Sequence, residues 1–160
     1  MSPARRRVSS SAPWEQVAGY SRAVAAGDFI FVSGCTSIVD GEVVYEGDMT
    51  RQTEQALVNV GTALAQLGAS LADVVRTRIY VTDISRWAEV AEAHRLAFED
   101  ALPATSMVQV AALIDPRMLV EVEAVAHREG GPDYDEAEPD RSEVPPNSIR
   151  IDDPSSDDSI

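Results

Sequence analysis

Short segments in which apolar and polar residues alternate recur between residues 13 and 128. This period of two is the pattern of half-buried β-strands. Ser21–Ala26 and Phe29–Thr36 flank Gly27-Asp28, which predicts two strands joined by a tight turn. Four further strands are expected, at Val43–Tyr45, Val74–Val81, Ala104–Ala111 and Leu119–Ala126.

The alternation is clearest in Val74–Val81. Successive side chains of a strand point to opposite faces of the sheet. We therefore expect Val75, Ile79 and Val81 to face the core, and the arginines and the tyrosine between them to face the other way.

Two other segments carry apolar residues three and four positions apart, which is the spacing of an amphipathic helix. The first begins at Asp48 or Thr50, either of which could be the N-cap, and ends near Gly68, where a left-handed C-cap is expected. The second begins at Asp83 or Ser85. The apolar stripe of the first helix is Ala56, Leu57, Val60, Leu64 and Leu67, and the second carries Trp87, Val90, His94 and Phe98.

This order of elements predicts an α+β fold, in which two helices cover one face of a mixed sheet. There is no internal repeat. Two helices leave the second face of the sheet uncovered, and an apolar face in water favours association, most often with closed symmetry. We therefore expect a homo-oligomer whose interface lies on that face.

Composition sets the limits of this domain at residues 13–128. Residues 1–12 are expected to be a flexible N-terminal tail. Residues 129–160 hold 11 acidic and 2 basic side chains and few large apolar residues. Such a segment buries too little surface to offset its backbone entropy, so a disordered acidic tail is expected. An acidic docking or autoinhibitory segment is the alternative.

The net charge of −14 over 160 residues excludes several classes of function. It argues against nucleic acid or an anionic membrane surface as a partner, because both bind clustered basic charge. The chain has no lysine, which excludes a Schiff-base or phosphate-loop lysine. No apolar run approaches the roughly 20 residues of a membrane span. Together with the single Cys35, these features predict a cytoplasmic protein.

Five sequence blocks in a characteristic order carry a further signal, namely Gly19–Val24, Phe31–Gly34, Gln52–Val60, Pro103–Ser106 and Val120–Ala126. These blocks resemble the Rid family, also called YjgF-type or enamine/imine deaminase, and in older usage endoribonuclease L-PSP. The resemblance implies a chorismate-mutase-like α+β fold, a homotrimer with clefts between subunits, and cofactor-free hydrolysis of enamines or imines to 2-oxo acids and ammonium.

The same resemblance assigns roles to individual residues. Tyr20 matches the family's pocket tyrosine, and Glu121 matches the glutamate that positions water. Thr105 stands where deaminating members have an arginine that clamps the substrate carboxylate, and Ala91 stands where they have an asparagine. A hydroxyl cannot replace the two-pronged donor of a guanidinium, so an altered substrate range is expected.

Strand periodicity offers one replacement for the lost arginine. Arg22 shares a face with Tyr20, so it could hold an anionic group, although a solvated strand arginine paired to a carboxylate is the alternative. The backbone from Thr105 to Met107 could add anion contacts. His94 could act as an acid or base at the cleft edge, or it could be a packed helix residue.

Other chemistry finds little support in the sequence. The two histidines lack ligand spacing, so no metal site is expected, and no cofactor is implied. Cys35 has no basic partner that can be named and is expected to be a buried, inert thiol. Gly19, Gly27 and Gly34 suit turns or close packing better than a phosphate loop.

The sequence thus predicts a hydrolase, deaminase or tautomerase that acts on a small imine or enamine in an intersubunit cleft. Glu121 and Tyr20 are the expected catalytic residues, and Arg22, Thr105, Met107 and His94 the expected substrate-binding residues. A non-catalytic trimeric module that binds a metabolite or a protein is the alternative.

Overall fold

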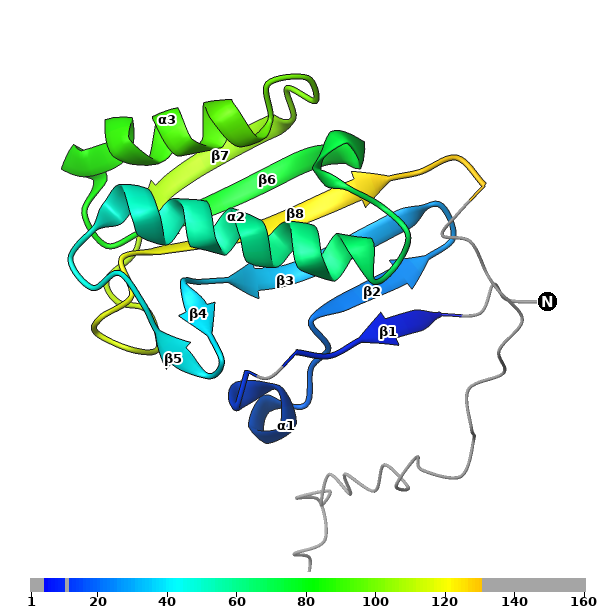
Figure 1. The fold of residues 1–160 in the computed structure, drawn as a ribbon, viewed down its shortest axis with the longest axis horizontal. Helices are drawn as coiled ribbons and strands as arrows, with labels where there is room; N and C mark the ends of the chain where they lie inside the picture. The colour runs from blue at the N-terminus through cyan, green and yellow to red at the C-terminus, as the bar shows by residue number, and fades with distance from the viewer. Residues whose placement is uncertain (1–4, 11, 131–160) are drawn as a thin grey trace, which may run out of the picture.

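A six-stranded sheet forms the centre of the computed structural model, which describes residues 5–10 and 12–130 (Figure 1). The order across the sheet is β1 (Arg6–Val8), β2 (Ala23–Ala26), β3 (Phe29–Cys35), β8 (Val120–His127), β6 (Val74–Val81) and β7 (Ala104–Gln109). Strands β6 and β7 are parallel, because the helix α3 (Trp87–Ala97) carries the chain back across the sheet between them. All other neighbouring strands in this sheet are antiparallel.

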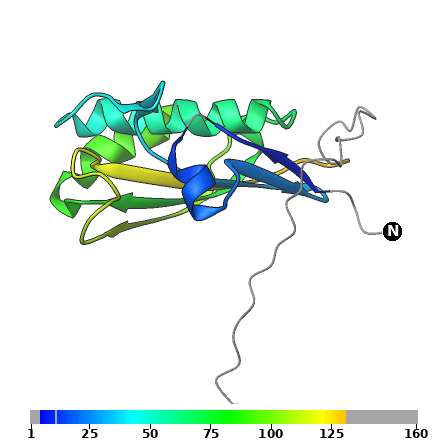
Figure 2. The ribbon, with the colours of Figure 1, turned by 90° about the horizontal axis from the view of Figure 1, so that it is seen from below.

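Two long helices, α2 (Met49–Ala65) and α3 (Trp87–Ala97), cover one face of this sheet, and the described chain leaves the opposite face without a helix (Figure 2). The predicted mixed sheet with two helices on one face is confirmed. Asp48 is the N-cap of α2, since its Oδ1 accepts the N–H of Arg51 at 2.9 Å. Gly68 adopts the expected left-handed conformation after the helix, at φ 75°.

Smaller elements complete the fold. The helix α1 (Trp14–Ala18) lies beside β1, and a two-stranded ribbon, β4 (Ile38–Val39) with β5 (Glu42–Val43), precedes α2 (Figure 1). Two short 3₁₀ turns, η1 (Leu71–Asp73) and η2 (Ile84–Arg86), precede β6 and α3. No helix in the described part of the chain is long and apolar enough to cross a membrane.

The core lies between the two helices and the sheet. Apolar residues that are fully or almost fully buried come from both layers. Burial of these side chains is the main favourable contribution to folding. Examples are Ile30, Leu64, Ile79, Val90, Val120 and Val122.

One predicted core residue, Val75, is exposed instead. The pairing of β6 with β8 shifts between Val74 and Arg76, so Val75 is the extra residue of a β-bulge. The bulge turns Val74 into the core in its place, while Ile79 and Val81 face the core as predicted. The alternation of apolar and polar residues cannot reveal such a shift in strand pairing. Side chains alternate regularly between the two faces only while each residue is paired with one residue of the neighbouring strand.

The ends of the domain differ in part from the prediction. Three residues placed in the N-terminal tail, Arg6–Val8, form β1 and pair with β2. A three-residue edge strand is held by backbone hydrogen bonds, so it needs no apolar alternation to form. The predicted strands Val43–Tyr45 and Ala104–Ala111 are shorter, as β5 and β7. Residues 131–160 of the predicted acidic tail lie outside the described residues.

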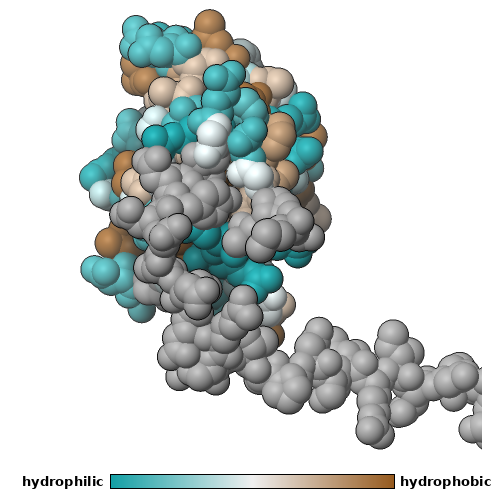
Figure 3. All heavy atoms as spheres, turned by 90° about the vertical axis from the view of Figure 1, so that its right-hand side faces the viewer, coloured by the Kyte–Doolittle hydropathy of each residue, from teal (hydrophilic) through white to brown (hydrophobic). Residues whose placement is uncertain are grey.

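The uncovered face of the sheet carries exposed aromatic residues. Phe29 and Phe31 of β3 are 44% and 49% exposed, whereas their neighbours Ile30 and Val32 are buried against the helices. At one end of the molecule, the visible described residues form an interspersed hydrophobic and hydrophilic surface (Figure 3). Large apolar side chains are exposed on the helices as well, for example Val58 of α2 and Trp87 of α3. The distinguishing feature of the open sheet face is its pair of neighbouring aromatic rings, Phe29 and Phe31, with 6.4 Å between ring centroids.

Candidate active site

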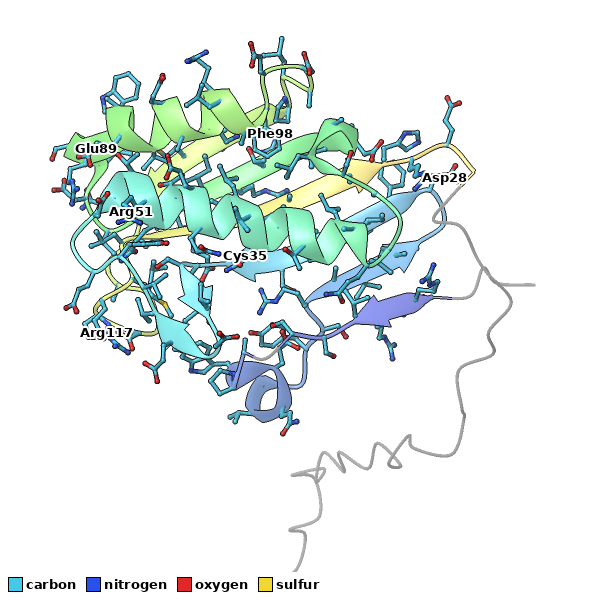
Figure 4. All side chains as sticks on the ribbon, viewed as in Figure 1. Asp28, Cys35, Arg51, Glu89, Phe98 and Arg117 are labelled. Atoms are coloured by element: carbon cyan, nitrogen blue, oxygen red, sulfur yellow. The ribbon has the colours of Figure 1, made fainter. Side chains whose placement is uncertain are left out.

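Tyr20, Arg22 and Glu121 line one cavity of about 430 Å³. Tyr20 and Arg22 follow the left-handed Gly19 that ends α1, and Glu121 projects from β8. Further lining comes from α2 and from the end of β3, which contacts Arg22 and Glu121 and carries Cys35 beside α2 (Figure 4). The fold thus brings together the two expected catalytic residues and the arginine that the sequence placed on the same face as Tyr20.

Arg22 is buried and uses most of its donors on the protein. Its Nε donates to Glu15 Oε1 at 3.1 Å, its Nη1 donates to the Gly34 carbonyl at 2.5 Å, and its Nη2 donates to Tyr20 Oη at 3.1 Å. The side chains of Arg22 and Glu15 are 9% and 5% exposed. The arrangement is that of an arginine paired to a carboxylate, with one N–H of Nη2 left over from these contacts.

The carboxylate of Glu121 lies directly over Gly34. A Cβ built on Gly34 would lie 2.6 Å from Glu121 Cδ, so only glycine leaves room for this side chain. Burial raises the pKa of Glu121, while the charge of Arg22 lowers it and the charge of Glu123 raises it further. A half-buried carboxylate of raised pKa in a cavity suits proton transfer.

Cys35 is close to this group but does not present a reactive thiolate. Its Sγ lies 3.6 Å from Arg22 Nη1. Burial raises the pKa of the thiol even though Arg22 opposes this effect. The side chain is therefore the buried, protonated thiol that the sequence predicted.

The other three predicted residues, His94, Thr105 and Met107, line a second cavity of about 330 Å³ between α3 and β7. His94 Nε2 lies 2.9 Å from Thr77 Oγ1, which lies 2.8 Å from Thr105 Oγ1. The His94 ring also packs on Phe98, which follows α3 and points toward the sheet, with 4.6 Å between ring centroids (Figure 4). Burial lowers the pKa of His94, so its geometry is that of the packed helix residue.

The two cavities lie on different parts of one chain. The first lies beside α1 and the ends of β3 and β8, and the second lies under α3 at the β7 edge of the sheet. A single chain therefore does not gather the six predicted residues into one site.

Sequence reasoning missed two residues that organise these cavities. Glu15 holds Arg22, and nothing in the local sequence distinguishes it from a solvent-exposed helix glutamate. Thr77 links His94 to Thr105, and it could have been found as the one hydroxyl on the core-facing side of β6. The part of the chain that the structure describes contains no cluster of three His, Cys, Asp or Glu side chains suited to a metal ion.

Comparison with known proteins gives consistent matches. The family model described as endoribonuclease L-PSP matches residues 10–128. A Streptomyces coelicolor protein is 40% identical over 128 residues, covering 79% of this chain and 95% of its own. The 2-iminobutanoate/2-iminopropanoate deaminase of Rattus norvegicus is 34% identical over 125 residues, covering 76% and 89%.

Comparison with solved structures gives the same family. A Mycobacterium tuberculosis member of the YjgF/YER057c/UK114 family has 52% sequence identity and a TM-score of 0.71, covering 78% of this chain and all of its own. These matches span the sheet, both long helices and both cavities. The chain therefore belongs to the endoribonuclease L-PSP family, the family of the YjgF or Rid proteins.

Proposed function

We propose that this protein hydrolyses small imines or enamines, releasing ammonia, in a site that is completed between copies of a homotrimer. The observation that carries the proposal is Glu121, a half-buried carboxylate that lies over Gly34 in the same cavity as Tyr20 and Arg22. The deaminase names of relatives such as the Rattus norvegicus protein support the same chemistry.

In this proposal Glu121 acts first as a base and then as an acid. It takes a proton from a water molecule while the water oxygen forms a bond to the imine carbon and the C=N electron pair moves to nitrogen. It then returns this proton to the nitrogen, which gives a neutral carbinolamine. In the last step Glu121 transfers the hydroxyl proton of the carbinolamine to the amine nitrogen while the C–N bond breaks, so that a carbonyl compound and ammonia leave. An enamine would first take a proton at its β-carbon. The raised pKa suits both steps, since the carboxyl must change its protonation state.

The proposed role of Tyr20 follows from the direction of its hydrogen bond. A guanidinium can only donate, so the Tyr20 oxygen accepts from Arg22 and its own O–H stays free to donate. That proton could be donated to the substrate nitrogen. Arg22 would then act mainly by holding Tyr20 and the Gly34 carbonyl, with one N–H left for a substrate atom.

Two observations support a trimer with shared sites. The exposed Phe29 and Phe31 give the uncovered sheet face an apolar area suited to contact with a second copy. The expected site residues also divide between two distant cavities of one chain, which contact between neighbouring copies could bring together.

The decisive experiment measures imine hydrolysis by the full-length protein. An oxidase generates the imine in the cuvette, and the rate of imine loss is compared with spontaneous hydrolysis. We expect acceleration by the wild type and a loss of at least about 100-fold in Glu121→Gln. Glu123→Gln is the matched control, because Glu123 lies on the same strand but pairs with Arg78 at 2.6 Å, and it should stay within about threefold of the wild type.

The alternative function has a distinct outcome. A folded trimer that binds imine analogues yet accelerates neither carboxylate-bearing nor neutral imines would be the non-catalytic binding module. Equal losses in Glu121→Gln and Glu123→Gln would likewise contradict a specific role for Glu121.

A further inference from the structure

The cavity between α3 and β7 has mostly apolar walls. Its lining comes from the inner side of the sheet, from α3 and from the loop that joins α3 to β7. The apolar lining residues are Ile79, Ala91, Phe98, Leu102, Pro103 and Met107. A pocket of this kind binds the apolar body of a ligand and uses few polar groups to orient it.

The one cation among the lining residues is Arg95, whose exposed guanidinium is bound by Glu92 with two hydrogen bonds of 3.1 Å and 2.9 Å. The inner walls of the cavity therefore carry no positive charge. The hydroxyl of Thr105 donates to the Pro103 carbonyl at 3.1 Å. Since a hydroxyl has one proton, Thr105 has no donor left for an anion.

Hydrogen bonds link His94 to Thr105 through Thr77. The Thr105 hydroxyl has two acceptors in reach, the Pro103 carbonyl at 3.1 Å and Thr77 Oγ1 at 2.8 Å, and its one proton serves only one of them. When Thr105 donates to Pro103, Thr77 donates to Thr105 and His94 Nε2–H donates to Thr77, which leaves Nδ1 of the neutral ring as an acceptor with no donor among the described residues. We adopt this proton order, which the ¹⁵N shifts of the His94 ring distinguish from the reverse order.

Leu102 adds an independent observation at the mouth of the cavity. Its side chain is 79% exposed, and its backbone has a φ of 42°, the left-handed region that favours glycine. Neither burial nor backbone preference explains a leucine here. Residues held in such conformations cluster at ligand sites, and this leucine lines the cavity.

We propose that this cavity binds an uncharged ligand group with an apolar body and an N–H or O–H donor, which His94 Nδ1 accepts. Resting on the function proposed above, this makes the preferred substrate a neutral imine or enamine with an apolar substituent rather than a 2-imino carboxylate. The donor would be the imine or enamine N–H itself, or a neutral amide on the substrate.

Benzamide and benzoate test this directly, because they have the same shape and differ in charge and in the N–H donor. Binding to the full-length protein is measured at pH 7.5 by calorimetry, and ¹⁵N NMR follows the His94 ring. We expect benzamide to bind at least tenfold more tightly than benzoate and to shift the His94 Nδ1 resonance. His94→Phe should remove that preference. Equal or tighter binding of benzoate would overturn the proposal.

The variant Leu102→Gly distinguishes a loss of ligand binding from a loss of stability. Glycine adopts the left-handed conformation without strain, so the variant should melt at the same temperature as the wild type or higher. We nevertheless expect benzamide to bind at least threefold more weakly, because an apolar wall is lost. Unchanged benzamide affinity in this variant would count against the site.

These binding results are separate from catalysis. Benzamide binding with no imine hydrolysis would overturn the proposed function and leave this site standing. Rapid hydrolysis of 2-imino carboxylates by a wild type that does not bind benzamide would support the proposed function and overturn the inference.

Discussion

At the scale of single residues, Arg22 and Glu121 bring opposite charges into one cavity under different constraints. Arg22 is held by Glu15, Gly34 and Tyr20, whereas the Glu121 carboxylate has no hydrogen-bond partner among the described residues. The charge of a cation held in this way lowers the pKa of Glu121 whether or not its remaining N–H contacts the substrate. The free carboxylate is the group that can change its protonation state during a reaction.

The first prediction concerns pH. Glu121 must be ionised to act as a base, so activity should fall as the pH drops through its pKa, which burial places above the ordinary value of 4.5. Arg22 lowers that pKa, so Arg22→Met should raise it and move the acidic limb of the kcat/KM profile to higher pH. Arg22→Lys keeps the positive charge, so the acidic limb of its kcat/KM profile should lie at the same pH as in the wild type. Identical pH profiles of the Arg22→Met and Arg22→Lys variants would contradict the prediction.

The second prediction concerns Thr105, whose hydroxyl is already bound to Thr77 and Pro103. Thr105→Arg should raise kcat/KM for a 2-imino carboxylate by roughly 10- to 100-fold, because a guanidinium can clamp the carboxylate with two charge-assisted hydrogen bonds. The matched control is Thr105→Gln, which has similar reach but no charge. A wild type that already hydrolyses this substrate rapidly, with no gain from arginine, would contradict the argument.

At the scale of elements, the N-terminal segment is tied to the sheet through one carboxylate. Glu15 on α1 accepts hydrogen bonds from the Ser10 N–H, at 2.9 Å, and from Arg22 beside β2. The same carboxylate therefore fixes the approach to α1 and the arginine of the first cavity.

The third prediction follows from this tie. Glu15→Gln leaves Arg22 as a buried cation without its counter-charge, which typically costs about 3–5 kcal/mol. We expect the melting temperature to fall by several degrees or more in a thermal scan. In the control Glu92→Gln the partner Arg95 is exposed, so the melting temperature should be nearly unchanged. Equal shifts in the two variants would show that Glu15 is not a structural tie.

At the scale of the whole molecule, the proposed assembly depends on the open sheet face. The helices bury one face, and the other keeps Phe29 and Phe31 in contact with solvent. A homotrimer would cover these residues and would join the two cavities of neighbouring copies.

The fourth prediction tests this assembly. Phe31→Asp should convert a species of three 17.2 kDa protomers into one protomer in sedimentation experiments, because a charge cannot be buried unpaired at an apolar contact. Its circular dichroism should be unchanged, and imine hydrolysis should be lost. Val17→Asp, on the exposed side of α1, should leave the trimer intact. A wild type that sediments as a monomer would contradict the proposal.

Local pattern was sufficient for most elements. The bounds of β6, the cap at Asp48 and the turn at Gly68 are those expected, since periodicity and capping depend on residues within one or two turns. The exposure of Val75 and the existence of β1 could not be predicted, because a bulge and an edge strand depend on how a distant strand pairs.

For the candidate site, the sequence by itself determined which residue types are present and which of them share a strand. Thr105 and Met107 line the same cavity, as alternation along their strand predicts. Tyr20 and Arg22 also share a cavity, but both precede β2, which begins at Ala23, so strand alternation does not account for their proximity. Only the tertiary structure decided that Glu15 holds Arg22, that Glu121 lies over Gly34, and that Thr105 is bound to Thr77. The alternation of side chains along a strand determines only to which face of the sheet each of them points. A hydrogen-bond partner depends instead on which segments the folded chain places side by side.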